Sequence, residues 1–174
     1  PFIIQGGGFC IFDSNLNITQ CEFNNNSILM ESKKEFKVLM ASFYGGALYS
    51  YNNAKSTNLY NCSFSHNLIK IPNHREKGFG GGIFLINGKI EKCKFLDNKA
   101  FNGGDIYYEQ TQTGRLEIID NEFNQKDIKY YYNEPIKSLI SIYGIYNSTN
   151  LNTFSKNKIE IIPNTVLFDG EMTF

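Results

Sequence analysis

The feature that most constrains the fold is a short order of residues that recurs along the chain. Each copy opens on paired glycines, continues through alternating apolar residues and closes on a Phe-x-x-Asn unit or a variant of it. The glycine pairs are Gly7-Gly8, Gly45-Gly46, Gly81-Gly82 and Gly103-Gly104, and a fifth has decayed to Ile142-Tyr143-Gly144-Ile145-Tyr146. The shortest copy spans roughly 22 residues, and periods of this size are typical of solenoids.

The repeat predicts an all-β fold. Each copy holds three short pieces in which apolar and polar residues alternate, and alternation is the strand period. One such unit cannot bury its apolar face alone, whereas stacked units bury it and pair each strand in parallel with its equivalent. We therefore predict a right-handed parallel β-helix of about five coils, because parallel crossovers usually take that hand. The whole chain, 1–174, forms one segment that we interpret as a piece of a longer protein.

Stacking places equivalent residues in columns. The closing units predict an inward ladder of aromatic rings formed by Phe23, Phe64, Phe95, Phe123 and Phe154. They also predict an asparagine ladder at a tight bend, formed by Asn26, Asn67, Asn98 and Asn157, because Asn tolerates left-handed backbone angles and its amide can bond to neighbouring copies. A further inward column is expected to hold Cys10, Leu48, Phe84 and Ile106.

The two tetrapeptides together carry a family resemblance. GGFC, GGAL, GGGI and GGDI, paired with FNNN, FSHN, FLDN and FSKN, span roughly residues 6–157. They resemble the Gly-Gly-x-Ile and Phe-x-x-Asn repeats of the chlamydial polymorphic membrane proteins and of similar pectin-lyase-like surface proteins of protists. The resemblance implies a surface-exposed β-helix with an adhesive or structural role. It carries no catalytic site, because the family motif has none to transfer.

The linkers between copies vary in length and all fall at one corner of the coil. Insertions in solenoids map to one face that is often used for binding. We therefore expect a partner protein, or neighbouring coils or subunits at the apolar ends, to contact the insertions 27–44, 68–80 and 127–141, with a carbohydrate as a further candidate. Within the first insertion, Leu29, Phe36, Met40 and Phe43 fit one face of a helix, interpreted first as a packed decoration and second as a partner-binding helix.

Catalytic chemistry finds little support in the repeat. Polysaccharide-active β-helix enzymes need carboxylates on adjacent coils of one face. Glu22 and Glu122 share a column, but Ser63 and Lys94 lie between them, and no acidic pair falls on neighbouring coils. No nucleophile triad is present, and Gly80–Gly82 lack the Lys-Ser/Thr of a phosphate-binding loop. We predict no catalytic residue, no cofactor and no metal site, and a net charge of +0 does not suggest a nucleic-acid partner. No apolar run is long enough to predict membrane insertion.

Three cysteines, Cys21, Cys62 and Cys93, occupy the same place in consecutive copies. Three thiolates in a line do not make the tetrahedron of a zinc site, and side chains stacked in parallel register point the same way, which disfavours a disulfide. We interpret them as a column of buried thiols that act as small hydrophobic groups.

Four sequons for N-glycosylation occur at Asn17, Asn25, Asn61 and Asn147, of which Asn25 and Asn147 lie in expected turns. Together with the resemblance they favour a non-enzymatic structural or adhesive segment of a large cell-surface or extracellular protein, in a fibre or larger assembly. The alternatives are a carbohydrate-active or carbohydrate-binding β-helix and an intracellular scaffold subunit.

Overall fold

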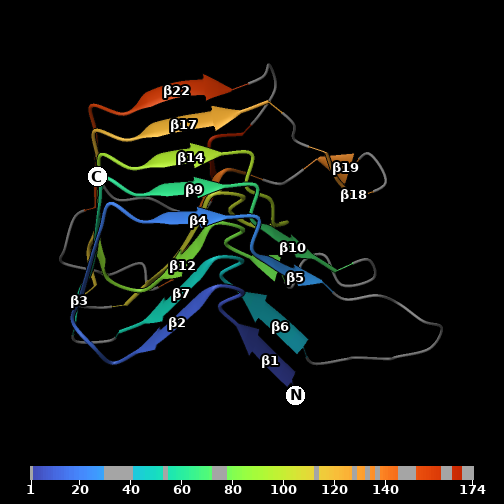
Figure 1. Cartoon of the computed structure of the whole chain (residues 1–174), viewed down its shortest axis with the longest axis horizontal. Helices are drawn as coiled ribbons and strands as arrows, with labels where there is room; N and C mark the ends of the chain where they lie inside the picture. Colours follow the sequence, from blue (N-terminus) through green and yellow to red (C-terminus); the bar gives the residue numbers. More distant parts are fainter. Residues whose placement is uncertain are drawn as a thin grey trace.

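The computed structural model describes residues 2–29, 41–52, 55–71, 78–111, 114–126, 129–131, 134–135, 138–144, 152–161 and 166–169. Every regular element in this part of the chain is a β-strand, and none is a helix. The strands stack in parallel sheets, so the prediction of an all-β fold built from stacked parallel strands is confirmed (Figure 1). No helix among these residues has the length and apolar character needed to cross a membrane.

Three larger sheets form the body of the fold. The six-stranded sheet contains β2 (Phe9–Phe12), β7 (Leu48–Tyr51), β12 (Ile83–Leu85), β15 (Ile106–Gln110), β20 (Ile140–Gly144) and β23 (Phe168–Asp169). A second sheet, called the β3 sheet, contains β3 (Leu16–Thr19), β8 (Thr57–Tyr60), β13 (Gly88–Glu91), β16 (Leu116–Ile119) and β21 (Thr153–Ser155). A third, called the β4 sheet, contains β4 (Glu22–Asn24), β9 (Ser63–Ser65), β14 (Lys94–Leu96), β17 (Glu122–Gln125) and β22 (Lys158–Ile161).

Three smaller sheets lie outside the three larger ones and are formed mostly by strands of the linkers. A three-stranded parallel sheet contains β1 (Phe2–Gln5), β6 (Ala41–Tyr44) and β11 (Gly78–Phe79), and β5 (Ser27–Leu29) pairs in parallel with β10 (Leu68–Lys70). An antiparallel pair joins β18 (Lys129–Tyr131) to β19 (Glu134–Pro135). In chain order, each linker leaves the β4 sheet and returns to the six-stranded sheet. The linkers therefore share one corner of the stack.

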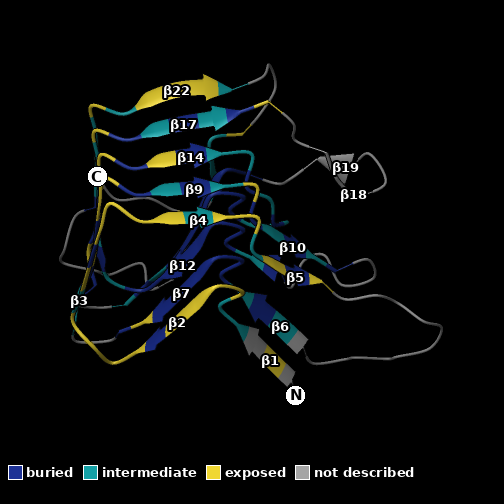
Figure 2. Ribbon diagram, in the orientation of Figure 1, coloured by how far each residue is buried: buried dark blue, intermediate teal, exposed yellow. Residues whose placement is uncertain are grey.

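The core lies between the three larger sheets. Strands of the β3 sheet such as β8 and β13 alternate buried and less buried residues, so every second side chain points inward, whereas β7 and β12 of the six-stranded sheet carry consecutive buried residues. Figure 2 shows this interior in dark blue and the more exposed strands β4 and β22 at the two ends of the β4 sheet. Phe23, Phe64, Phe95 and Phe123 are register partners in successive strands, and their rings stack at centroid distances of 4.7, 5.3 and 4.9 Å.

The fifth copy has a different register from the one predicted. Phe154 pairs with Ile118 in the β3 sheet, and Ile159 takes the place next to Phe123. Asn157 likewise does not continue the column of Asn98, because its side chain accepts hydrogen bonds from Asn121. The predicted ladders are therefore wrong in register at Phe154, although its ring still lies tilted at 6.2 Å from that of Phe123, and wrong at Asn157. The reason is a near-duplicate pattern, since Asn152-Thr-Phe and Asn157-Lys-Ile fit the same unit five residues apart.

A one-residue slip also corrects the column expected for Cys10, Leu48, Phe84 and Ile106. The inward column runs through Phe9, Leu48, Ile83, Ile106 and Ile140, while Cys10 and Phe84 fall in the outward column with Tyr49 and Tyr107. The glycines with positive φ are Gly6, Gly45, Gly80 and Gly103. In the two runs of three glycines, the first two residues (Gly6-Gly7 and Gly80-Gly81) are therefore the equivalents of Gly45-Gly46 and Gly103-Gly104. At Gly46 an added Cβ would lie 2.1 Å from the carbonyl oxygen of Gly81, which leaves no room for a side chain.

The expected helix in the first insertion is wrong at both ends. Leu29 lies in β5 and is exposed, whereas Phe43 lies in β6 and is buried. Phe36 and Met40 lie outside the described residues. Both strands pair with strands from the second insertion, so these insertions extend the parallel stack.

Candidate functional site

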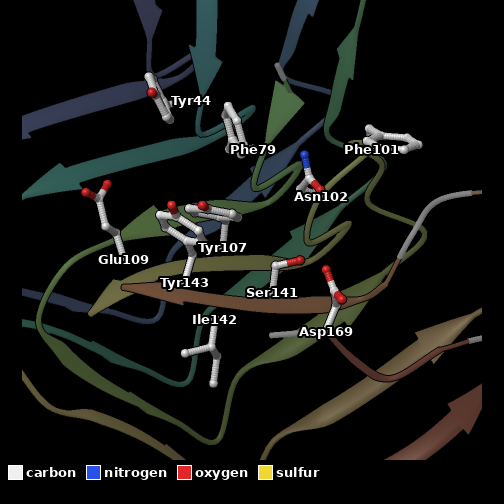
Figure 3. A pocket seen from close by; sticks show the side chains of 10 residues that line it. All are labelled: Tyr44, Phe79, Phe101, Asn102, Tyr107, Glu109, Ser141, Ile142, Tyr143 and Asp169. Carbon is white, nitrogen blue, oxygen red and sulfur yellow. The ribbon is translucent and has the colours of Figure 1, made fainter. Parts of the chain in front are cut away.

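A groove of about 630 Å³ opens on the outward face of the six-stranded sheet, beside the three-stranded sheet. Its size falls within the range of ligand sites in proteins. Figure 3 shows the ten side chains that line it: Tyr44, Phe79, Phe101, Asn102, Tyr107, Glu109, Ser141, Ile142, Tyr143 and Asp169.

The register of the sheet explains the floor of the groove. Tyr107 in β15 pairs with Ser141 in β20, and Ser141 pairs with Asp169 in β23. Two residues further along the same strands, Glu109 pairs with Tyr143. Because side chains alternate along a strand, the residues of these two columns project from the same face of the sheet. The groove floor is thus built from three successive strands.

The linkers supply the walls. Tyr44 ends the first insertion, Phe79 lies at the end of the second, and Phe101 and Asn102 belong to the short segment that follows Asn98. Ser141, the last residue of the third predicted insertion, lies in β20 and belongs to the floor. The first three linkers between the β4 sheet and the six-stranded sheet therefore each place a side chain on the wall of this groove. The sequence predicted a binding face at the insertions, and the groove lies where their ends converge.

The aromatic rings are in contact with one another. Tyr44 stacks on Phe79 with centroids 5.1 Å apart, and Phe79 meets Tyr107 edge-on at 4.9 Å. Tyr107 continues the ring column through Phe84 to Tyr49, at 5.5 and 4.9 Å. Tyr107 is only 8 % exposed, whereas Tyr143 is 64 % exposed. The groove therefore combines an ordered aromatic floor with a ring that is open to solvent.

The charged side chains among the described residues of the groove are all of one sign. Glu109 and Asp169 carry its carboxylates, and no Lys, Arg or His is among the described residues that line it. Burial raises the pKa of Glu109. Burial also raises the pKa of Tyr107, with smaller contributions from Glu109, Tyr44, Tyr143 and Asp169. Nearby negative charge disfavours the phenolate, so these shifts mark the electrostatic influence of both carboxylates on Tyr107.

The two carboxylates lie on either side of the tyrosines, as Figure 3 shows, with Glu109 to the left and Asp169 to the right of Tyr107. Asp169 lies two strands from Tyr107 in the same column, and Glu109 lies two residues further along β15. The separation of two strands across the sheet and the length of two residues along the strand combine to place the Cα atoms of Glu109 and Asp169 roughly 12 Å apart. Glu109 and Asp169 are thus members of one groove without being register partners.

Glu109 and Asp169 are not found as a candidate acidic pair from the sequence when acidic residues are compared only within single columns, because they lie in different columns. Asp169 lies beyond the last recognised copy, and the one-residue slip at Phe84 hid the outward aromatic column. Within the described strand pairs, Glu22, Ser63, Lys94 and Glu122 do follow one another in register, as the repeat predicted. The sequence signal that could have indicated the groove floor is the alternation of Tyr107 and Glu109 in one copy, opposite Ser141 and Tyr143 in the next.

The side chains of the asparagine ladder form hydrogen bonds to one another and to backbone groups at the bend. Asn67 is fully buried, and its amide donates to the carbonyl oxygen of Phe23 and to Oδ1 of Asn98, both at 2.8 Å. Its own Oδ1 accepts from the backbone and side chain of Asn26. The left-handed angles, however, belong to the preceding residues, Asn25 and His66 among them. The ladder residues thus satisfy backbone groups and do not themselves adopt the strained conformation expected for them.

The cysteine column has free thiols, and the prediction that they are buried is wrong at Cys21, which precedes the end strand β4 of its sheet. Cys62 and Cys93 are buried and Cys21 is exposed, and the backbone N–H of Cys62 donates to Sγ of Cys93 at 3.4 Å. Burial raises the pKa of the Cys93 thiol to about 12. Asn121 and Asn157 follow Cys93 in this corner, each bonding to the coil before it. In the described part of the chain, no group of three or more His, Cys, Asp or Glu side chains is arranged to hold a metal ion.

The three sequons within the described residues lie away from the groove. Asn17 projects from β3 and accepts a hydrogen bond from Asn58, while Asn25 and Asn61 occupy left-handed turn positions. All three asparagines are exposed. Asn147 lies outside the described residues.

Comparison of the chain with protein-family models, with curated proteins and with solved structures gave no match.

Proposed function

We propose that this chain is a non-enzymatic binding segment of a large cell-surface or extracellular protein, and that it attaches to its partner through the groove. The observation that carries this proposal is the convergence of linkers from successive coils on one solvent-open, aromatic-lined depression. Aromatic side chains are enriched in the energetic centres of protein interfaces, because they bury large areas with few rotatable bonds. An adhesive or structural role uses this surface without requiring any bond to be broken.

The fold proposed to carry this function is a right-handed parallel β-helix of about five coils, formed by one continuous segment over residues 1–174. Its support is the parallel pairing of successive strands in each larger sheet, between which the chain passes through the other two larger sheets. Crossover connections between parallel strands of one sheet are right-handed in nearly all proteins. Such an arrangement presents equivalent corners one above another, so that short linkers build a continuous surface.

A surface-adhesion assay tests the proposal. Beads coated with the parent protein, with Tyr143→Ser or with Tyr60→Ser are applied to matrix-protein and glycan surfaces. Tyr143 and Tyr60 are both exposed tyrosines, but Tyr60 lies on the β3 sheet. We expect the parent and Tyr60→Ser to adhere and Tyr143→Ser to lose adhesion. Equal adhesion by the two variants would show that the groove is not the adhesive surface.

A second candidate function rests on the two carboxylates. Glu109 and Asp169 line the same groove, and paired carboxylates flank the scissile bond in most glycoside hydrolases. The parent and Glu109→Gln are incubated with neutral and acidic polysaccharides, and new reducing ends are measured. Release by the parent that Glu109→Gln abolishes would favour a carbohydrate-active enzyme. Binding to a polysaccharide without release would favour a carbohydrate-binding module.

The extracellular location is proposed from the sequons together with the exposure of Asn17, Asn25 and Asn61. The intact mass of the native protein, before and after enzymatic removal of N-glycans, tests it. A loss of mass places the chain on the secretory route. An unchanged mass removes this support and favours the alternative of an intracellular scaffold.

A further inference from the structure

The groove also indicates what kind of partner it accepts, and this inference rests on the proposed binding function. We propose that the groove binds an extended basic segment of a partner protein, whose Arg or Lys side chains lie between its rings and its two carboxylates.

The first step is the lining. Faces of Tyr and Phe rings attract cations through their quadrupoles, and planar guanidinium groups also stack on them. Tyr143 offers a ring that is 64 % exposed, and the contacting rings of Tyr44 and Phe79 form a wall above Tyr107. Figure 3 shows the rings of Tyr107 and Tyr143 between the two carboxylates. A cation entering here meets aromatic surface and negative charge together.

The second step is charge complementarity. Both charged side chains among the described residues of the groove are acidic, namely Glu109 and Asp169. Acidic polysaccharides or phosphate groups would meet repulsion from both, whereas a cationic segment is attracted by both. Neutral sugars would use the rings but would gain nothing from the carboxylates. The charge pattern therefore favours a basic partner over the other classes.

The third step is spacing. The Cα atoms of Glu109 and Asp169 are roughly 12 Å apart, from two strand spacings and two residues. In an extended peptide, side chains four residues apart lie on the same face at a distance of about 13 Å. Two basic residues separated by three others would thus reach both carboxylates at once. A basic pair separated by one residue, at about 7 Å, would reach only one.

Fluorescence polarisation with a labelled peptide tests this inference. The probe is a short Gly/Ser peptide with two arginines that are separated by three residues. The matched control peptide carries citrulline, the neutral isostere, at both positions. We expect saturable binding of the arginine peptide and binding about tenfold weaker, or none, for the citrulline peptide. A third peptide, with one residue between its arginines, should bind with intermediate affinity.

The variants locate the binding on the protein. Glu109→Gln, Asp169→Asn and Tyr143→Ala should each weaken binding of the arginine peptide about fivefold or more. Asp120→Asn removes the same unit of charge at an exposed turn between the β3 and β4 sheets, and should leave binding unchanged. Circular dichroism checks that each variant is folded, and Tyr143→Ala keeps the test informative if an acidic variant misfolds, because that side chain is mostly exposed.

Three outcomes would overturn the inference: equal binding of the citrulline peptide, no binding of the arginine peptide, or equal loss with Asp120→Asn. These outcomes are separate from the adhesion assay. If Tyr143→Ser still abolishes adhesion while the arginine peptide fails to bind, the partner is not basic and the proposed function stands. If groove variants leave adhesion unchanged, the proposed function itself is wrong.

Discussion

Asn98 donates a side-chain hydrogen bond to Oδ1 of Asp105 at 2.9 Å, and both residues are fully buried. The other carboxylate oxygen of Asp105 has no hydrogen-bond partner within the described part of the chain. The asparagine ladder that runs through Asn26, Asn67 and Asn98 therefore ends on a carboxyl group inside the fold. Burial raises the pKa of Asp105 to about 7, and the hydrogen bond from Asn98 opposes this shift.

Substituting Asp105 by Asn should stabilise the protein at high pH. A carboxyl whose pKa is raised from 3.8 to about 7 binds its proton more tightly in the folded state. The folded chain therefore loses stability as pH rises from about 4 to about 7, by an amount on the order of 4 kcal/mol. Asp105→Asn is neutral throughout and avoids this loss. Urea unfolding should show the variant to be more stable than the parent at pH 8, with a smaller difference at pH 5.

Asp120→Asn serves as the control for this experiment, because Asp120 is exposed and Asn tolerates its left-handed backbone angle. Its unfolding free energy should follow that of the parent at both pH values. If Asp105→Asn were no more stable than the parent at pH 8, the buried carboxyl would have to be compensated in a way that its hydrogen bond to Asn98 does not explain.

Removing the amide of Asn67 should destabilise the protein strongly. The substitution Asn67→Ala would leave the part-buried carbonyl of Phe23 and the part-buried backbone N–H of Asn26 without their side-chain partners. A buried polar group left unsatisfied is destabilising by about 1–3 kcal/mol, so for these two part-buried groups we expect a total loss of about 2 kcal/mol or more. Asn24→Ala, at an exposed position of β4, should change the unfolding free energy by less than about 1 kcal/mol. Equal midpoints in urea for the two variants would contradict a supporting role for the ladder.

The sequence predicts the fold class because the repeat carries both strand alternation and a closing aromatic. Phe23, Phe64, Phe95 and Phe123 are register partners, since a large buried ring at a constant place tolerates only one alignment. Runs of three glycines do not have this property. Glycine has no side chain to mark a face, so the sequence leaves open which glycine adopts the positive φ, and a shift by one residue exchanges the two faces of the strand.

The groove could not be predicted for the same reason. The outward residues Phe84 and Tyr107 are covered by Tyr44 and Phe79 respectively, which belong to insertions and not to the repeat. Alternation therefore fails to distinguish the core from the groove floor, because both sides of β12 are buried. The insertions were identified as the binding face, but the convergence of their ends on β15 and β20 depends on tertiary packing.

Replacing the ring of Phe95 should lower stability by about 3–5 kcal/mol, the usual loss for a large buried side chain. Phe95 is 1 % exposed and lies between the rings of Phe64 and Phe123. Phe95→Ala leaves a cavity that its stacked neighbours cannot fill without shifting. Thermal and urea unfolding measure the effect, with Phe12→Ala as the control, because Phe12 is 55 % exposed. A Phe95→Ala variant that unfolds like the parent would show that the stack contributes little to stability.

Binding of the arginine peptide in the groove should weaken as the pH falls, and Glu109 should set much of this dependence. Burial raises the pKa of Glu109, so its carboxylate takes up a proton at a higher pH than an exposed glutamate does. The groove also contains Tyr44, Tyr107 and Tyr143, Asp169 is its other acidic group, and arginine keeps its charge. Dissociation constants measured by polarisation between about pH 8 and about pH 4 should therefore rise toward acid for the parent. Glu109→Gln should bind more weakly at pH 8 and show a flatter profile than the parent. A parent profile that is as flat as that of Glu109→Gln would mean that the Glu109 carboxylate does not contact the bound cation.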